Sequence, residues 1–248
     1  MKNIYFLILL AISPWPTQAE TVKVCATNWH PYSIENNDGE ITSGSSFEIH
    51  AEAFRRMKVD FTIESLPWKR CVIEVRKGNI HALLDADPSA YADLIFSAHP
   101  TIYNEVAVFV RKEFPEKHYD PVRLKGKKVA LPAGYGSYIS AAKKNGWIID
   151  EAQDEENVIR MLLGKRLDYA LLDLASVRGL KIKLDIDVKR LNPLAIQQKL
   201  STGFLPKNRK LVEKYDQAIS DMIEEGFMDD VFKKYFLFSY SEMLSIHY

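Results

Sequence analysis

The sequence ALLD occurs twice in this chain, at residues 82–85 and again at residues 170–173. Each copy follows a glycine that lies next to a basic residue, Gly78 in the first case and Gly164 in the second. Such a glycine is typical of a helix end, and a short apolar run after it is typical of a buried strand. Because four residues can repeat by chance, the flanking elements decide whether the repeat reflects the fold.

The first copy completes an alternation of strands and helices. Residues 22–26 and 59–63 alternate apolar and polar side chains and predict two strands. Ser45 is expected to cap a helix between them, and Pro67 suits the first turn of a second helix that Gly78 ends. The order β-α-β-α-β, with ALLD as the third strand, is typical of a mainly parallel sheet.

The same order restarts after Pro121. Residues 127–131 predict a strand, residues 134–138 a tight turn into a helix, and Asp154 the cap of a further helix that ends at Gly164. The second ALLD strand follows. The chain therefore predicts an α/β fold with two lobes, each a mainly parallel sheet flanked by helices.

Residues 106–110 are apolar and predict an extended strand, and its return partner is expected near residues 200–205, so that two strands cross between the lobes as a hinge. We expect residues 20–107 and 204–248 to form lobe 1 and residues 108–203 to form lobe 2. Residues 1–19 have the features of a signal peptide, with a basic start, a short apolar run and small residues before the cut. The protein is therefore expected in the periplasm.

The charge balance argues against a nucleic-acid partner, because 33 basic residues face 33 acidic ones. No dinucleotide fingerprint, P-loop or histidine pair is present, so no cofactor and no metal are expected. The protein is expected to be a monomer. Cys25 and Cys71 would form one disulfide in an oxidising compartment, or would be two buried thiols.

Aromatic residues follow the predicted strands, at the edge where parallel α/β sheets bind ligands. Trp29 and Tyr32 follow the first strand and Trp68 the second, where their rings could pack on a small ligand or simply on each other. Asp85 and Asp173 end the ALLD strands, one in each lobe. Their carboxylates could hold a cationic or hydroxyl-bearing ligand, or could cap the next helix or turn.

Several short motifs occur in an order known from one family. They are Trp29-x-Pro31-Tyr32 and residues 67–71, 78–82, 95–100, 125–130, 166–173 and 226–236. In this order they resemble the extracytoplasmic, or periplasmic, solute-binding proteins of family 3, of the polar amino acid-binding type. The resemblance spans nearly the whole chain after residue 19. It implies a type II periplasmic-binding-protein-like fold whose two lobes close on a ligand.

The resemblance also implies binding residues. The closing aspartate of the family, which holds the α-amine, matches Asp173. The lobe-two amides that hold the carboxylate fall at Gly136, Ser137 and Tyr138. The family's arginine is missing: its position falls at Ala90 or Tyr91, in a segment that carries Asp87 and Ser89 instead. Arg70, beside Trp68, is the basic residue that could replace it.

The resemblance predicts a protein that captures a small polar solute, amino-acid-like or amine-bearing, for delivery to a membrane transporter. One alternative is a cyclohexadienyl or arogenate dehydratase-like enzyme on the same scaffold, with Asp85, Asp87 or Asp173 as the general acid. Another is a sensory module that presents its ligand to a membrane receptor.

Overall fold

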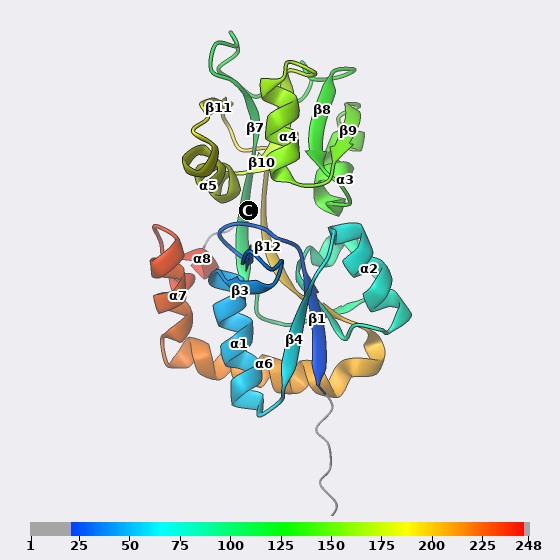
Figure 1. Ribbon diagram of the computed structural model, residues 1–248, viewed down its shortest axis with the longest axis vertical. Coiled ribbons are helices and arrows are strands. Elements are labelled where there is room, and N and C mark those ends of the chain that lie inside the picture. Colours follow the sequence, from blue (N-terminus) through cyan, green and yellow to red (C-terminus); the bar gives the residue numbers. More distant parts are fainter. Residues whose placement is uncertain (1–20, 246–248) are drawn as a thin grey trace, which may run out of the picture.

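The computed structural model describes residues 21–245, so the predicted signal peptide lies outside the described residues. Two lobes are stacked along the long axis of the molecule, and two long strands run between them (Figure 1). These crossing strands are β7 (Ile102–Arg111) and β12 (Ile196–Phe204). Among residues 21–245 no helix is long and apolar enough to cross a membrane.

The lower lobe in Figure 1 contains a parallel sheet in the order β4-β1-β5. Its strands are β1 (Val22–Ala26), β4 (Phe61–Ser65) and β5 (Ala82–Ala86). Its other elements are α1 (Ser45–Met57), α2 (Trp68–Lys77), the hairpin β2 (Ile34–Glu35) and β3 (Ile41–Ser43), the short helix η1 (Pro88–Ala90) and β6 (Ile95–Phe96).

The upper lobe repeats this plan with a parallel sheet in the order β10-β8-β9. Its strands are β8 (Lys128–Pro132), β9 (Ile148–Ala152), β10 (Tyr169–Asp173) and the short β11 (Val188–Arg190). Its helices are α3 (Gly136–Lys144), α4 (Glu155–Leu163) and α5 (Leu174–Leu184). Apolar side chains of α3 pack on one face of the sheet and those of α4 and α5 on the other.

The two ALLD copies are strands β5 and β10, and every residue of both strands is buried. They occupy equivalent places. β5 pairs with β1 in parallel and with the crossing strand β12 antiparallel, while β10 pairs with β8 in parallel and with the crossing strand β7 antiparallel. Each ALLD strand therefore connects the parallel strands of its lobe with a crossing strand. The two copies of the motif occupy equivalent positions in the two lobes.

The crossing strands also pair with each other. Residues 102–106 of β7 pair antiparallel with residues 196–200 of β12. The remainder of β7 pairs with β10 in the upper lobe, and the remainder of β12 pairs with β5 in the lower lobe. The hydrogen-bonded ladder is thus continuous from one lobe to the other. The hinge is a two-stranded ribbon rather than two separate segments.

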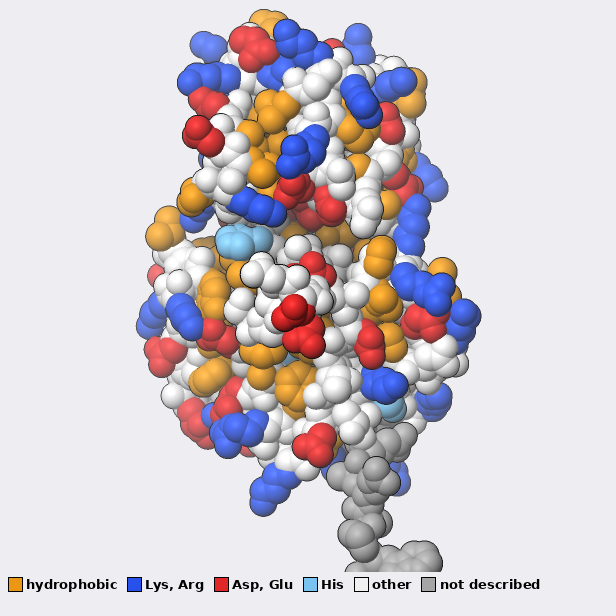
Figure 2. Space-filling model, viewed as in Figure 1, with side chains coloured by type: hydrophobic (Ala, Val, Ile, Leu, Met, Phe, Trp, Pro, Cys, Tyr) orange, Lys and Arg blue, Asp and Glu red, His pale blue; other side chains and the backbone are white. Residues whose placement is uncertain are grey.

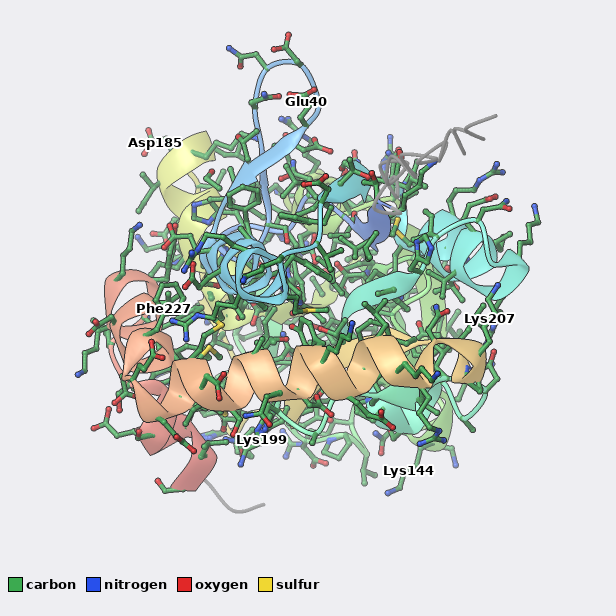
Figure 3. The ribbon with its side chains drawn as sticks, turned by 90° about the horizontal axis from the view of Figure 1, so that it is seen from below. Glu40, Lys144, Asp185, Lys199, Lys207 and Phe227 are labelled. Carbon is green, nitrogen blue, oxygen red and sulfur yellow. A yellow bond between two sulfur atoms is a disulfide. The ribbon has the colours of Figure 1, made fainter. Side chains whose placement is uncertain are left out.

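After η2 (Pro206–Asn208), the chain continues in α6 (Arg209–Glu224), α7 (Phe227–Tyr235) and α8 (Tyr240–Ser245). Figure 3 shows α6 lying across the base of the molecule, from the end near Lys207 to the end near Phe227. Its apolar side chains share one core with β1, β5, α1 and α7. In this core Tyr215 of α6 lies with Phe54 of α1 and Phe232 of α7. The C-terminal helices therefore complete the core of the lower lobe.

The predicted disulfide is confirmed, since Cys25 and Cys71 are joined by an S–S bond of 2.01 Å. It ties β1 to the first turn of α2, and both residues are fully buried. The predicted cap at Ser45 is wrong, because α1 begins after Gly44 and has no side-chain cap. A β-carbon at Gly44 would lie 2.3 Å from the carbonyl oxygen of Tyr32, so this close approach needs glycine.

Candidate functional site

An inner cavity of about 30 Å³ lies between the lobes. Its walls come from the lower lobe, the upper lobe and both crossing strands. The lining residues are Trp29, Trp68, Asp85, Asp87, Tyr91, Asn104, Tyr135, Gly136, Ser137, Tyr138, Gln198 and Leu200. None of these described lining residues is lysine or arginine, so the charged groups in the cavity wall are carboxylates.

Aromatic rings from both lobes meet at this cavity. The Tyr135 ring of the upper lobe lies 5.9 Å from that of Trp29 and 6.1 Å from that of Trp68, both in edge-on geometry. Tyr91 accepts a hydrogen bond of 2.8 Å from the indole of Trp68, and its own hydroxyl lies 3.4 Å from the carbonyl oxygen of Gly134. The rings fix the positions of the two tryptophans.

Asp85 is a buried carboxylate aimed by an unusual backbone. Its φ is 53°, a left-handed value that is uncommon for any residue but glycine, asparagine and aspartate. Ser46 and Thr101 donate hydroxyl hydrogen bonds to its two oxygens, the second at 2.7 Å. Burial lowers the pKa of the neighbouring His50, which therefore stays neutral at pH 7. No ion pair to Asp85 occurs among residues 21–245.

Asp173 lies deeper and is satisfied by groups of the protein. Its oxygens accept hydrogen bonds from Tyr32 at 3.3 Å, from Asn104 at 3.0 Å and from the backbone N–H of Ser176 at 2.7 Å. The last of these bonds makes Asp173 the N-cap of α5. Asp173 is 1% exposed, and burial raises the pKa of its carboxyl to about 6.

Seven of the predicted binding residues line the inner cavity. They are Trp29, Trp68, Asp85, Asp87, Gly136, Ser137 and Tyr138. Tyr32, Arg70, Ser89 and Asp173 do not line it. Arg70 pairs with Glu74 at 3.0 Å on the surface, Ser89 donates to Asp87, and Tyr32 donates to Asp173.

Five lining residues were not predicted: Tyr91, Asn104, Tyr135, Gln198 and Leu200. Tyr135 lies between the two glycines of the predicted turn, so its position was a usable signal. Tyr91 falls where the family's arginine was expected. Asn104 and Gln198 lie opposite each other on the crossing strands, 3.3 Å apart between the amide groups. The occurrence of polar residues inside the crossing strands was the sequence feature that could have identified Asn104 and Gln198.

A larger outer groove of about 580 Å³ also lies between the lobes. Figure 2 shows the hollow between the two lobes, with acidic side chains on its upper edge. Trp29 lines both this groove and the inner cavity. Glu155, at the start of α4, is 6% exposed in the groove and accepts a hydrogen bond of 2.8 Å from the Tyr135 hydroxyl. Burial raises the pKa of Glu155 to about 7.

The lobes touch each other around the cleft. Lys69 of the lower lobe pairs with Glu151 of the upper lobe. Gly136 lies against Ala90, where an added β-carbon would come within 2.7 Å of the alanine side chain. The two lobes are therefore in direct contact at these two places. Within the described part of the chain, no group of three or more His, Cys, Asp or Glu residues could hold a metal ion.

The raised pKa of Glu155 leads to a prediction. A carboxyl whose folded-state pKa is about 7 costs stability when ionised, and that cost disappears as the pH falls toward its unfolded pKa. We expect Glu155→Gln to be more stable than the wild type at pH 8 by about 2 kcal/mol, and to lose most of that advantage by pH 5. Urea unfolding at both pH values measures this. As a control, Glu156→Gln should show no such advantage at pH 8, because hydrogen bonds from Lys183 and Arg160 lower the pKa of this half-buried neighbour.

Comparisons with known proteins agree with this architecture. The family model for bacterial extracellular solute-binding proteins, family 3, matches residues 22–238. A search against curated proteins finds no match. Among solved structures, a P235GK mutant of ArgBP from T. maritima superposes with a TM-score of 0.76 at 18% identity, covering 87% of this chain and 94% of that one.

Two further structures share the fold. Tv2483 bound to L-arginine gives a TM-score of 0.78 at 16% identity, with 92% of this chain and 94% of that chain covered. An ABC uptake transporter substrate binding protein from Streptococcus pneumoniae with bound histidine gives 0.76 at 16% identity, with coverage of 87% and 92%. These matches confirm the predicted type II fold. Because the family model covers most of the chain, this protein belongs to the bacterial extracellular solute-binding proteins, family 3, and its role is solute binding.

Proposed function

We propose that this protein captures a small amine-bearing solute between its lobes and delivers it to a membrane transporter. One observation carries the choice of ligand: the inner cavity is walled by tryptophan and tyrosine rings, contains Asp85 and Asp87, and has no lysine or arginine in its lining. A carboxylate-bearing ligand would meet like charge there. An ammonium group would meet carboxylates and aromatic faces, both of which attract it.

Asp85 supports this choice because its charge is buried without a cation. Removing a carboxylate from water is costly unless a partner of opposite charge compensates it. Ser46 and Thr101 supply hydrogen bonds but no charge. A ligand ammonium at Asp85 would supply the missing positive charge. Ligand binding would therefore compensate the cost of keeping this carboxylate away from water.

The transport role has support from the family and from related structures. The matched family is described as extracellular, and one similar structure is a substrate binding protein of an amino acid ABC transporter, with a TM-score of 0.74. The matched family and these structures are binding proteins. We propose that the protein acts in the periplasm as a monomer that docks on a transporter. The dehydratase-like and receptor-partner alternatives gain no support from these matches.

A thermal-shift screen of the purified protein tests the proposal. Primary amines at about 100 times their dissociation constant would add about 2.7 kcal/mol of stability by mass action. For a chain of this size that corresponds to a rise in Tm of roughly 5–10 °C. Acidic and neutral α-amino acids at the same concentration should give little shift. Stabilisation by glutamate or glutamine but by no simple amine would contradict the proposed ligand chemistry.

A further inference from the structure

Building on the proposed function, we infer that the ligand is an elongated diamine that occupies two compartments. One ammonium group lies in the inner cavity at Asp85. The carbon chain passes along Trp29, and the second ammonium group lies in the outer groove at Glu155. Neither Glu155 nor the outer groove follows from the family's amino acid-binding residues.

The two compartments are neighbours across Trp29 and Tyr135. Trp29 lines both of them. The Tyr135 ring lines the inner cavity, while its hydroxyl donates to Glu155, which lines the outer groove. The proposed carbon chain would run past Trp29, the residue common to both compartments.

The sizes of the compartments divide the ligand in the same way. The inner cavity, at about 30 Å³, has room for a group the size of one water molecule or one ammonium. The outer groove, at about 580 Å³, falls in the range of ligand sites. An amine head therefore fits inside, and the remainder of the molecule has to extend outward.

Glu155 is a buried acid of the groove that lacks a cation among residues 21–245. It is 6% exposed, and its carboxyl is held by the Tyr135 hydroxyl without an ion pair among the described residues. Asp173 from the end of β10 and Asp154 from its own helix end act on it as like charges, and Lys183, which lines the same groove, pairs with Glu156 instead. Its neighbour Glu156 differs, since Arg160 and Lys183 already pair with it, at 2.6 and 2.9 Å.

A free helix N-terminus attracts anions, but two of the three that approach the groove, those of α4 and α5, are already capped by carboxylates. The third, that of α2 after Pro67, has no side-chain cap. Asp154 accepts the N–H of Asn157 at the start of α4, and Asp173 accepts the N–H of Ser176 at the start of α5. Across the groove, burial and then Lys183 lower the pKa of His30, which is therefore neutral at pH 7.

Polar atoms in the groove provide further support for a ligand there. The hydroxyl of Ser176 lies against the Asp173 carboxyl, and the indole N–H of Trp29 is buried without a hydrogen-bond partner among residues 21–245. Both residues line the groove, and they are 2% and 7% exposed. Buried polar groups normally have partners. The Ser176 oxygen can accept a bond from the second ammonium.

Calorimetric titration of the purified protein with putrescine and cadaverine, against butylamine and pentylamine of equal chain length, tests the inference. We expect each diamine to bind at least about 10-fold more tightly than its matched monoamine. Glu155→Gln should remove most of that preference while monoamine affinity stays within about 3-fold. Glu213→Gln, with the same change of charge at an exposed position of α6 outside both compartments, should keep the preference.

Proton release provides a second readout. A bound cation lowers the pKa of Glu155, so at pH 7 a diamine should release roughly half a proton, whereas a monoamine should release none. Titration in buffers of different ionisation heat measures this number, and Glu155→Gln should abolish it. Monoamine binding without a diamine preference or proton release would overturn the two-compartment inference alone. Failure of every amine to bind would overturn the proposed function with it.

Discussion

Replacing Asp85 by asparagine is expected to weaken amine binding at least about 30-fold, because it removes the buried charge that the ammonium needs. Losing one partner of a buried charge pair costs about 2–5 kcal/mol, and each 1.4 kcal/mol is a factor of ten in affinity. Asparagine keeps the shape of the side chain. It also tolerates the φ of 53°, and its amide oxygen can accept one of the two hydroxyl hydrogen bonds while its NH2 group donates to the oxygen of the other hydroxyl.

Calorimetry with the best amine from the thermal screen measures the effect, and urea unfolding shows whether the variant is folded. Asp93→Asn is a matched control. Asp93 is a surface acid that pairs with Arg76, with 2.7 Å between the two groups, and it does not line the cavity. Its affinity should stay within about 2-fold of the wild type. If Asp173→Asn, and not Asp85→Asn, abolished binding, the amine would be held by Asp173, as the family resemblance implies.

Removing the disulfide should produce the largest loss of stability. The bond closes a loop with a sequence separation of 46, and the chain-entropy estimate for a loop of that length is on the order of 4 kcal/mol at 25 °C. A Cys25→Ala, Cys71→Ala double variant tests this without placing a polar hydroxyl in the core. Because both cysteines are fully buried, small cavities would add to the loss.

Urea unfolding of the double variant and of the wild type, each with and without reductant, measures the loss. Reductant should lower the stability of the wild type toward that of the variant and leave the variant unchanged. Equal stability of the oxidised wild type and the double variant would show that the bridge contributes nothing to the free energy of unfolding.

Much of the fold was predictable because hydrophobic periodicity and helix-ending glycines depend on nearby residues. The first strand was predicted at residues 22–26 and occupies Val22–Ala26. Both ALLD strands were predicted, and Asp154 caps α4 as expected. The cap at Ser45 was mistaken because the close approach of Gly44 to Tyr32 is a tertiary contact that no local pattern reveals.

The binding site was predictable only in part. The edge of a parallel sheet indicated Trp29, Trp68 and Asp85, all of which line the cavity. The contact of Tyr135 with both tryptophans depends on how one lobe meets the other, which the sequence of either lobe does not encode locally. Glu155 looked like an ordinary first-turn acid of a helix, and only its burial between the lobes distinguishes it.

The ribbon formed by β7 and β12 limits how the two lobes can move relative to each other. Sliding one strand along the other would break every rung from Ile102 to Val106 at once, whereas flexing the ribbon keeps those bonds. Flexing is the motion of a hinge, as opposed to shear. We therefore expect the lobes to open by bending or twisting of the ribbon, and the distance between spin labels placed one on each lobe would report that motion.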